Sequence, residues 1–169
     1  MGLLLEIFSV VLLLISLWLG IKYLILLTVK HNADRAFEKL CSKLKKQYEL
    51  IDTLFSQFSV MSVEERSFTE NIKNLISQAA EFSIEKDGNE RIIGYANSIL
   101  ENVEIFVDGI VQKDAENQNV QKYNSKMLDF NKTKDSYNKS AKILRHYVDV
   151  FPTSLMARLK EIKTMDYLN

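Results

Sequence analysis

The sequence predicts an all-α protein, in which a single N-terminal transmembrane helix precedes an antiparallel up-and-down bundle of about four long helices. Three observations predict this fold class. The chain begins with an apolar segment long enough to cross a membrane. Apolar residues then recur at three-and-four spacing, which is typical of amphipathic helices. Turn-forming residues are few, since the 169 residues include five glycines and one proline.

The apolar segment runs from Leu3 to Ile21 and is followed at once by Lys22. At about 1.5 Å of rise per residue, such a helix covers the roughly 30 Å of hydrocarbon in a bilayer. A cleaved signal peptide fits poorly, because no basic residue precedes the segment and no run of small residues ends it. We therefore predict a retained anchor, with the lipid-facing residues Leu3, Ile7, Leu12, Ile15, Trp18 and Ile21.

Residues 23–29 are apolar again, so the membrane span can extend beyond Lys22. We assign residues 1–29 to the anchor and its juxtamembrane segment, and residues 30–169 to the helical bundle. No Lys or Arg precedes the span and many follow it, which favours a bundle in the cytoplasm and an N-terminus outside. A bundle in the periplasm or outside the cell is the alternative.

The basic residues after the span have a second interpretation, which is contact with anionic lipid. The candidates are Lys22, Lys30, Lys39, Lys43, Lys45 and Lys46. The whole chain balances 22 Lys and Arg against 22 Asp and Glu, so it has no electrostatic reason to bind nucleic acid.

Four apolar stripes predict the bundle helices. The first runs from Phe37 to Met61 without an interrupting Gly or Pro, so this helix can continue directly from the anchor. Ser62 and Glu65 form a capping box that begins a second helix, and the turn-forming residues 86–89 end it. A third stripe runs from Ile92 to Ile110.

The fourth helix has large residues at every seventh position, a spacing found in coiled coils and bundles. Combined with the first helix, this predicts the core residues Phe37, Leu44, Ile51, Phe58, Phe130, Tyr137, Leu144 and Phe151. Asn124, Asn131 and Asn138 each follow a ring of this seam. They either face water, which we slightly favour, or form hydrogen bonds across helices.

Pro152 ends the fourth helix, because the residue before a proline is disfavoured in the helical region. Thr153 or Ser154 can then cap a short amphipathic helix. We expect its apolar residues, with Met165, Tyr167 and Leu168, to cover one end of the bundle; the alternative is a docking face for another protein.

Two spaced motifs carry a resemblance to a known family. Tyr137 and Asn138, followed 14 residues later by FPTSLMA from Phe151, resemble the C-terminal signature of the LemA family. The segment after the anchor is similar to that family's A-W-x-x-I-x-x-x-L-K-R-R-Y-D-L-I-P-x-L run. Its matching residues are Ala36, Leu40, Leu44, Lys45, Lys46, Tyr48, Glu49, Leu50, Ile51 and Leu54.

The chain departs from this pattern at several positions. Phe37 replaces the family's tryptophan, Asp52 replaces its proline, and Leu144 and Arg145 replace its second YN pair. The Y-P-x-L-K segment before the last helix is missing. The resemblance implies a divergent member: a bacterial, N-terminally anchored membrane protein with a cytoplasmic helical bundle. It brings no catalytic residues.

The residues also argue against an enzyme. His31 and His146 are the only histidines and stand far apart in the sequence, so no transition-metal spacing exists. Cys41 lies on an apolar stripe, where a core thiol is expected, and the glycines form no phosphate loop. We therefore expect no enzyme activity and no cofactor.

Two functions remain for such a chain. The first is a membrane-anchored interaction or scaffold protein, whose partners are other membrane-associated proteins or further copies of itself. The alternative is a membrane-organising protein that binds anionic lipid and self-assembles through its bundle.

Overall fold

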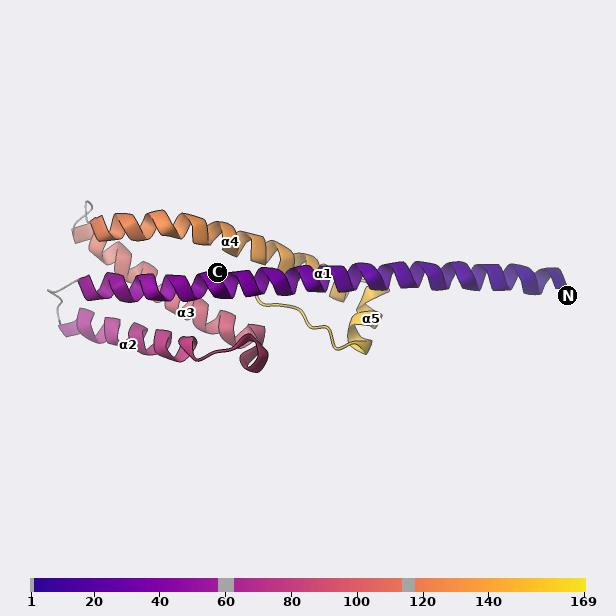
Figure 1. Cartoon of the computed structure of the whole chain (residues 1–169), viewed down its shortest axis with the longest axis horizontal. Helices are drawn as coiled ribbons and strands as arrows, with labels where there is room; N and C mark the ends of the chain where they lie inside the picture. Colours follow the sequence, from indigo (N-terminus) through magenta and orange to yellow (C-terminus); the bar gives the residue numbers. More distant parts are fainter. Residues whose placement is uncertain (1, 58–62, 114–117) are drawn as a thin grey trace. The chain divides into compact units, whose positions relative to one another are not determined.

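A computed structural model describes residues 2–57, 63–113 and 118–169, and Figure 1 shows the order of its helices. The helices are α1 (Gly2–Gln57), α2 (Val63–Ala80), α3 (Ile84–Lys113), α4 (Gln118–Asp149) and α5 (Thr153–Leu159). The described residues contain no strand. The predicted all-α fold is therefore confirmed, with four long helices in the described residues, of which the first begins with the long apolar segment.

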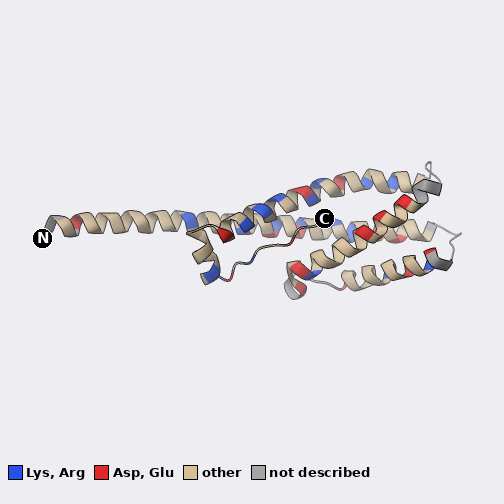
Figure 2. Ribbon diagram, turned by 180° about the vertical axis from the view of Figure 1, so that it is seen from behind, with Lys and Arg blue, Asp and Glu red and all other residues tan. Residues whose placement is uncertain are grey.

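Helix α1 is a single helix of 56 residues (Figure 1). Its first part carries no charge between Glu6 and Lys22, and Figure 2 shows this stretch as tan ribbon without blue or red segments. Large apolar side chains there are exposed, for example Phe8 at 65% and Leu13 at 65%. Among the described helices, α1 is the one long and apolar enough to cross a membrane. The expected continuity from the anchor into the first bundle helix is confirmed.

Contacts within the chain define two compact units. Unit 1 contains Met1–Arg35 and Lys139–Met165. Its core combines α1, α4, α5 and the segment after α5, through Leu26, Ala33, Leu144, Ala157 and Ile162. Leu26, which we assigned from the sequence to the anchor segment, is fully buried in this protein core. The first segment of unit 1 therefore does not end at residue 29, where we had placed the boundary between the anchor segment and the bundle.

Unit 2 contains Ala36–Asn138 and Asp166–Asn169. Its four helical parts run up and down. Antiparallel packing of α1 on α4 is seen in the tilted ring pair Phe37–Tyr137, with centroids 5.8 Å apart, and in the ion pair between Lys43 and Asp129. The edge-to-face pair Phe55–Phe106 joins α1 to α3 at 4.9 Å.

The apolar seams lie in the cores of these units. Phe37, Leu44, Ile51, Phe130, Tyr137 and Leu144 are all buried. Phe58 lies outside the described residues. Phe151 was predicted to be core, and this is wrong, because its side chain is 73% exposed. Helix α4 ends at Asp149, so Phe151 no longer follows the helical rotation that would return it to the seam.

Two local expectations need correction. The turn-forming residues 86–89 do not end the second helix, because α2 ends earlier, at Ala80. They do include a helix break: Gly88, with φ of 70° and ψ of 169°, is non-helical and interrupts α3 near its start. Neither Thr153 nor Ser154 caps α5. Pro152 occupies the N-cap position without a side-chain cap, and the Thr153 hydroxyl donates to the Val150 carbonyl at 2.7 Å.

Prediction for the core seam: Phe130→Ala should lower the free energy of unfolding by about 3 to 5 kcal/mol, because removal of this fully enclosed ring leaves a cavity in the core. Phe151→Ala is the matched control and should change stability by less than about 0.5 kcal/mol. Denaturant unfolding of the full chain in detergent, followed by circular dichroism, measures both. Equal losses for the two variants would contradict the assigned core.

Candidate functional site

The most specific polar arrangement in unit 2 holds Asp166–Asn169, which we call the tail segment. These residues form no helix, yet Leu168 is only 1% exposed. Backbone N–H and C=O groups beside a buried side chain lose water and need other partners. Three asparagines, which we call the asparagine clamp, supply these partners: Asn89 and Asn97 from α3 and Asn138 from α4.

Asn138 binds both backbone groups of Leu168. The Leu168 N–H donates to the Asn138 Oδ1 at 3.0 Å, and the Asn138 Nδ2 donates to the Leu168 carbonyl at 2.7 Å. A carboxamide presents one donor and one acceptor side by side, as a neighbouring β-strand does. Asn138 therefore acts on Leu168 as a strand would, although the described chain contains no strand.

Asn97 binds the backbone groups on either side of Leu168. Its Nδ2 donates to the Tyr167 carbonyl at 3.2 Å, and its Oδ1 accepts from the Asn169 N–H at 2.7 Å. In an extended chain, the backbone groups of successive residues point in alternate directions. The alternation between Asn138 and Asn97 is therefore the hydrogen-bond pattern of an extended peptide.

Asn89 and Tyr137 both bind the backbone of Asp166, the first residue of the tail segment. The Asp166 N–H donates to the Asn89 Oδ1 at 2.6 Å, and the Tyr137 hydroxyl donates to the Asp166 carbonyl. The Asn89 Nδ2 donates to the Tyr137 hydroxyl oxygen at 2.6 Å, which closes the network. Burial raises the pKa of Tyr137 to about 12, so the hydroxyl keeps its proton and stays a donor at neutral pH.

The site thus holds the tail segment mainly through the backbone of that segment. It uses one enclosed side chain, Leu168, whose burial contributes about 2 kcal/mol, and backbone hydrogen bonds that each contribute about 1 kcal/mol net. The side chains of Asp166 and Asn169 are exposed. This arrangement can bind an extended peptide, and its sequence requirement is concentrated at one apolar position.

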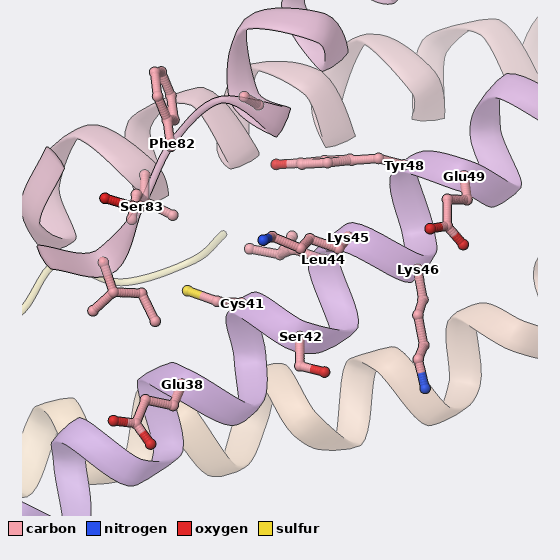
Figure 3. A pocket seen from close by; sticks show the side chains of 13 residues that line it. Glu38, Cys41, Ser42, Leu44, Lys45, Lys46, Tyr48, Glu49, Phe82 and Ser83 are labelled. Atoms are coloured by element: carbon pink, nitrogen blue, oxygen red, sulfur yellow. The ribbon is translucent and has the colours of Figure 1, made fainter. Parts of the chain in front are cut away.

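A second feature of unit 2 is a cavity of about 740 Å³ between α1, the end of α2 and the start of α3 (Figure 3). Its lining combines apolar Leu44, Tyr48 and Phe82 with charged Glu38 and Lys45. The Cys41 sulfur points into it in Figure 3. Burial raises the pKa of the Cys41 thiol to about 11, and Lys45 opposes this shift only partly. The thiol is therefore a protonated, weakly nucleophilic group at neutral pH.

Two of the predicted lipid-facing basic residues form ion pairs. Lys30 pairs with Asp34 at 2.6 Å in unit 1, and Lys43 pairs with Asp129 in unit 2. The hydrogen bond from Lys43 lowers the pKa of Asp129. Lys39, Lys45 and Lys46 are exposed, and Lys22 is half-buried.

The anchor residues Ile7, Leu12, Ile15, Trp18 and Ile21 are exposed along the first part of α1. Leu3 belongs to α1, but its side chain lies outside the described part.

Sequence analysis missed most of the clamp. We slightly favoured water as the partner of Asn138, which is wrong, because both groups of its carboxamide bind the tail segment. Asn89 was assigned to a turn and Asn97 was not singled out. The available signal was Asn97 itself, since asparagine is unfavourable inside a helix and here follows directly after Ala96 of the apolar stripe.

No family model, curated protein or solved structure matches the chain. Among the described residues, no group of three His, Cys, Asp or Glu side chains could hold a metal ion.

Prediction for the clamp: Asn138→Ala should lower the free energy of unfolding by about 2 to 4 kcal/mol, because it leaves the N–H and C=O of buried Leu168 without partners. Asn124 follows Tyr123 as Asn138 follows Tyr137, but its side chain is exposed. Asn124→Ala should therefore lower the free energy of unfolding by less than about 0.5 kcal/mol. Both variants are compared by thermal and denaturant unfolding. A neutral Asn138→Ala would show that the tail segment is not held as described.

Prediction for the cavity: Cys41 should react with iodoacetamide at pH 8 about a hundredfold more slowly in the folded chain than in urea, because a pKa of about 11 instead of 9.0 reduces the thiolate fraction by that factor. The rate in the folded chain should rise with pH up to about 11. Equal rates in the folded and unfolded chains would contradict the buried, protonated thiol.

Proposed function

We propose that this protein is a membrane-anchored helical interaction module of the LemA type, with its bundle on the cytoplasmic side. One observation carries the proposal: α1 is a single helix whose first part exposes apolar side chains and whose later part belongs to a protein core. Apolar side chains exposed over several turns are costly in water and stable in lipid. The helix therefore attaches the bundle directly to the bilayer surface.

The polar chemistry of unit 2 supports binding as the activity. Its most specific hydrogen-bonding groups are carboxamides and a neutral tyrosine hydroxyl, and they form hydrogen bonds with the backbone of the tail segment. Such groups position a chain; they do not transfer protons at neutral pH. Tyr137 and Asn138, which carry part of the LemA resemblance, both belong to this arrangement.

The geometry of α1 weighs against the lipid-binding alternative. At about 1.5 Å of rise per residue, Lys39 lies about 13 Å and Lys46 about 24 Å beyond Lys30 along the helix axis. Electrostatic attraction to a charged surface is screened over about 8 Å at physiological salt. With a span that ends at Lys30 and a helix close to the membrane normal, Lys46 lies beyond the screened reach of the headgroups, which extend about 5 to 8 Å past the hydrocarbon, whereas Lys39 lies within about one screening length of them.

Crosslinking tests the proposed interaction directly. A photoreactive amino acid is placed at Ile105 on α3 or at Leu128 on α4, two apolar positions that are 60% and 67% exposed. Irradiation of the full chain in its own membrane should give discrete protein adducts. Leu4, which is 74% exposed on the anchor, is the matched position and should give lipid adducts. Lipid adducts at all three positions would favour the membrane-organising alternative.

Prediction for the topology: a cysteine at Asp108, an exposed position on α3, should resist a membrane-impermeant thiol reagent in intact cells and react after lysis. The reason is the excess of basic residues after the span. Cys41 is first changed to Ser to remove the background. Ready labelling in intact cells would place the bundle outside the cytoplasm.

A further inference from the structure

We propose that the cavity between α1, the end of α2 and the start of α3 binds a long-chain fatty acid. Lys45 and Tyr48 hold its carboxylate, and its alkyl chain lies against the apolar wall of the cavity. This ligand site goes beyond the interaction with proteins proposed above and does not depend on it. The residues that line the cavity all belong to unit 2, so its geometry is that of one compact unit.

The apolar part of the cavity fits an alkyl chain. Its volume of about 740 Å³ lies within the range of roughly 300 to 1,000 Å³ that is usual for pockets that bind small molecules. Apolar side chains from α1, α2, α3 and the segment between α2 and α3 line it, namely Leu44, Ala79, Phe82, Ile84 and Ile92. Ile84 is 42% exposed. An alkyl chain in the cavity removes such apolar surface from water, which is the main source of affinity for an apolar ligand.

Tyr48 brings an unpaired hydrogen-bond donor to the cavity. This residue is only 7% exposed, and its hydroxyl forms no hydrogen bond with any residue in the described ranges 2–57, 63–113 and 118–169. Figure 3 shows the hydroxyl directed away from α1, toward the segment that carries Phe82 and Ser83. Burial raises the pKa of Tyr48, and nearby Cys41 adds to this, so the hydroxyl keeps its proton at neutral pH. A ligand oxygen that accepts this proton in a hydrogen bond satisfies the group.

Lys45 makes the cavity selective for an anion. In Figure 3 its ammonium group points to the same side of α1 as the Tyr48 hydroxyl and the Cys41 sulfur, whereas Lys46 points away. Burial raises the pKa of the Cys41 thiol, whereas Lys45 lowers it, and the effect of Lys45 is larger than the opposite effect of Glu38. Lys45 forms no ion pair with another residue of the described part of the chain. The local field in the cavity therefore favours a negatively charged group.

A carboxylate satisfies both polar groups at once. It accepts a hydrogen bond from the Tyr48 hydroxyl and pairs with the Lys45 ammonium. Tyr48 follows Lys45 by three residues in α1, so the two side chains lie on one face of this helix. The ligand class that joins one carboxylate to a long apolar chain is a fatty acid. An alcohol of the same length lacks the charge, and a short acid lacks the apolar area.

The wall of the cavity opposite α1 is held in place by its own contacts. The ring of Phe82 packs edge-to-face on Tyr95, with centroids 4.8 Å apart, and the Arg91 guanidinium lies 4.7 Å from the Phe82 ring centroid. The Ser83 N–H donates to the Asp87 Oδ2 at 2.9 Å. The segment between α2 and α3 therefore has a defined conformation before a ligand enters, as in most small-molecule sites.

The test uses the thiol of Cys41, the single cysteine of the chain, as a reporter in the full chain held in lipid nanodiscs. Alkylation by iodoacetamide is followed by mass spectrometry while palmitate is added in steps. Saturating palmitate should slow the reaction at least about fivefold, because the alkyl chain blocks access to the sulfur. Hexadecanol, which lacks the charge, and octanoate, which has half the chain, should each need at least about tenfold more ligand for the same protection.

Two substitutions separate the groups that recognise the carboxylate. Lys45→Met and Tyr48→Phe should each raise the palmitate concentration for half-maximal protection by about tenfold, since each removes one hydrogen bond to a charged ligand. Lys45 is exposed, so its substitution leaves the core intact. Lys46→Met is the matched control, because this lysine points away from the cavity, and should change that concentration by less than about twofold. Each variant is compared with its own alkylation rate without ligand, because Lys45 also acts on the thiol.

A photoreactive palmitate with a diazirine in its alkyl chain locates the ligand without using the thiol. Irradiation should give adducts at Leu44, Phe82 or Ile92, and excess palmitate should remove them more effectively than excess hexadecanol. Absence of these adducts and of Cys41 protection in the folded chain would overturn the inference. Equal protection by palmitate and hexadecanol would overturn the assignment to a carboxylate, and so would an equal effect of Lys45→Met and Lys46→Met.

Discussion

Helix α1 must satisfy two different surroundings with one uninterrupted backbone. Its first part exposes apolar side chains, whereas from Phe37 onward the apolar residues form one buried stripe. The helical repeat is common to both parts, although only the second part needs an apolar stripe. The proposed membrane attachment depends on this continuity.

The tail segment meets a different constraint. A buried leucine draws its own backbone out of water, and an extended segment without a neighbouring strand has no backbone partners. Asparagine side chains replace that strand here, with Asn138 and Asn97 serving alternate backbone groups. The hydrogen bonds of these asparagines all go to backbone groups of the tail segment, and the enclosed side chain of the segment is that of Leu168.

The helices were predictable because their signal is repeated along the sequence. The apolar stripe of α1 and the seven-residue repeat of α4 each keep one spacing, and six predicted core residues are buried. The prediction for Phe151 failed because α4 ends at Asp149, so the helical repeat does not extend to Phe151. The clamp was not predictable, because Asn89, Asn97 and Asn138 share no sequence spacing. Their common property is hydrogen bonding to residues that are 30 to 77 positions away in the chain, and only folding brings them together.

The continuity of α1 across two surroundings can be measured by spin-label accessibility along the helix in lipid bilayers. The account predicts that labels at Leu13 and Leu17 are accessible to oxygen and shielded from a water-soluble nickel complex. Labels at Lys39 and Glu49, which are exposed on the same helix, should show the reverse. A label at Leu40 or Ile51, both fully buried, should be shielded from both reagents. Accessibility of Leu13 and Leu17 to the nickel complex would contradict the membrane-anchored account.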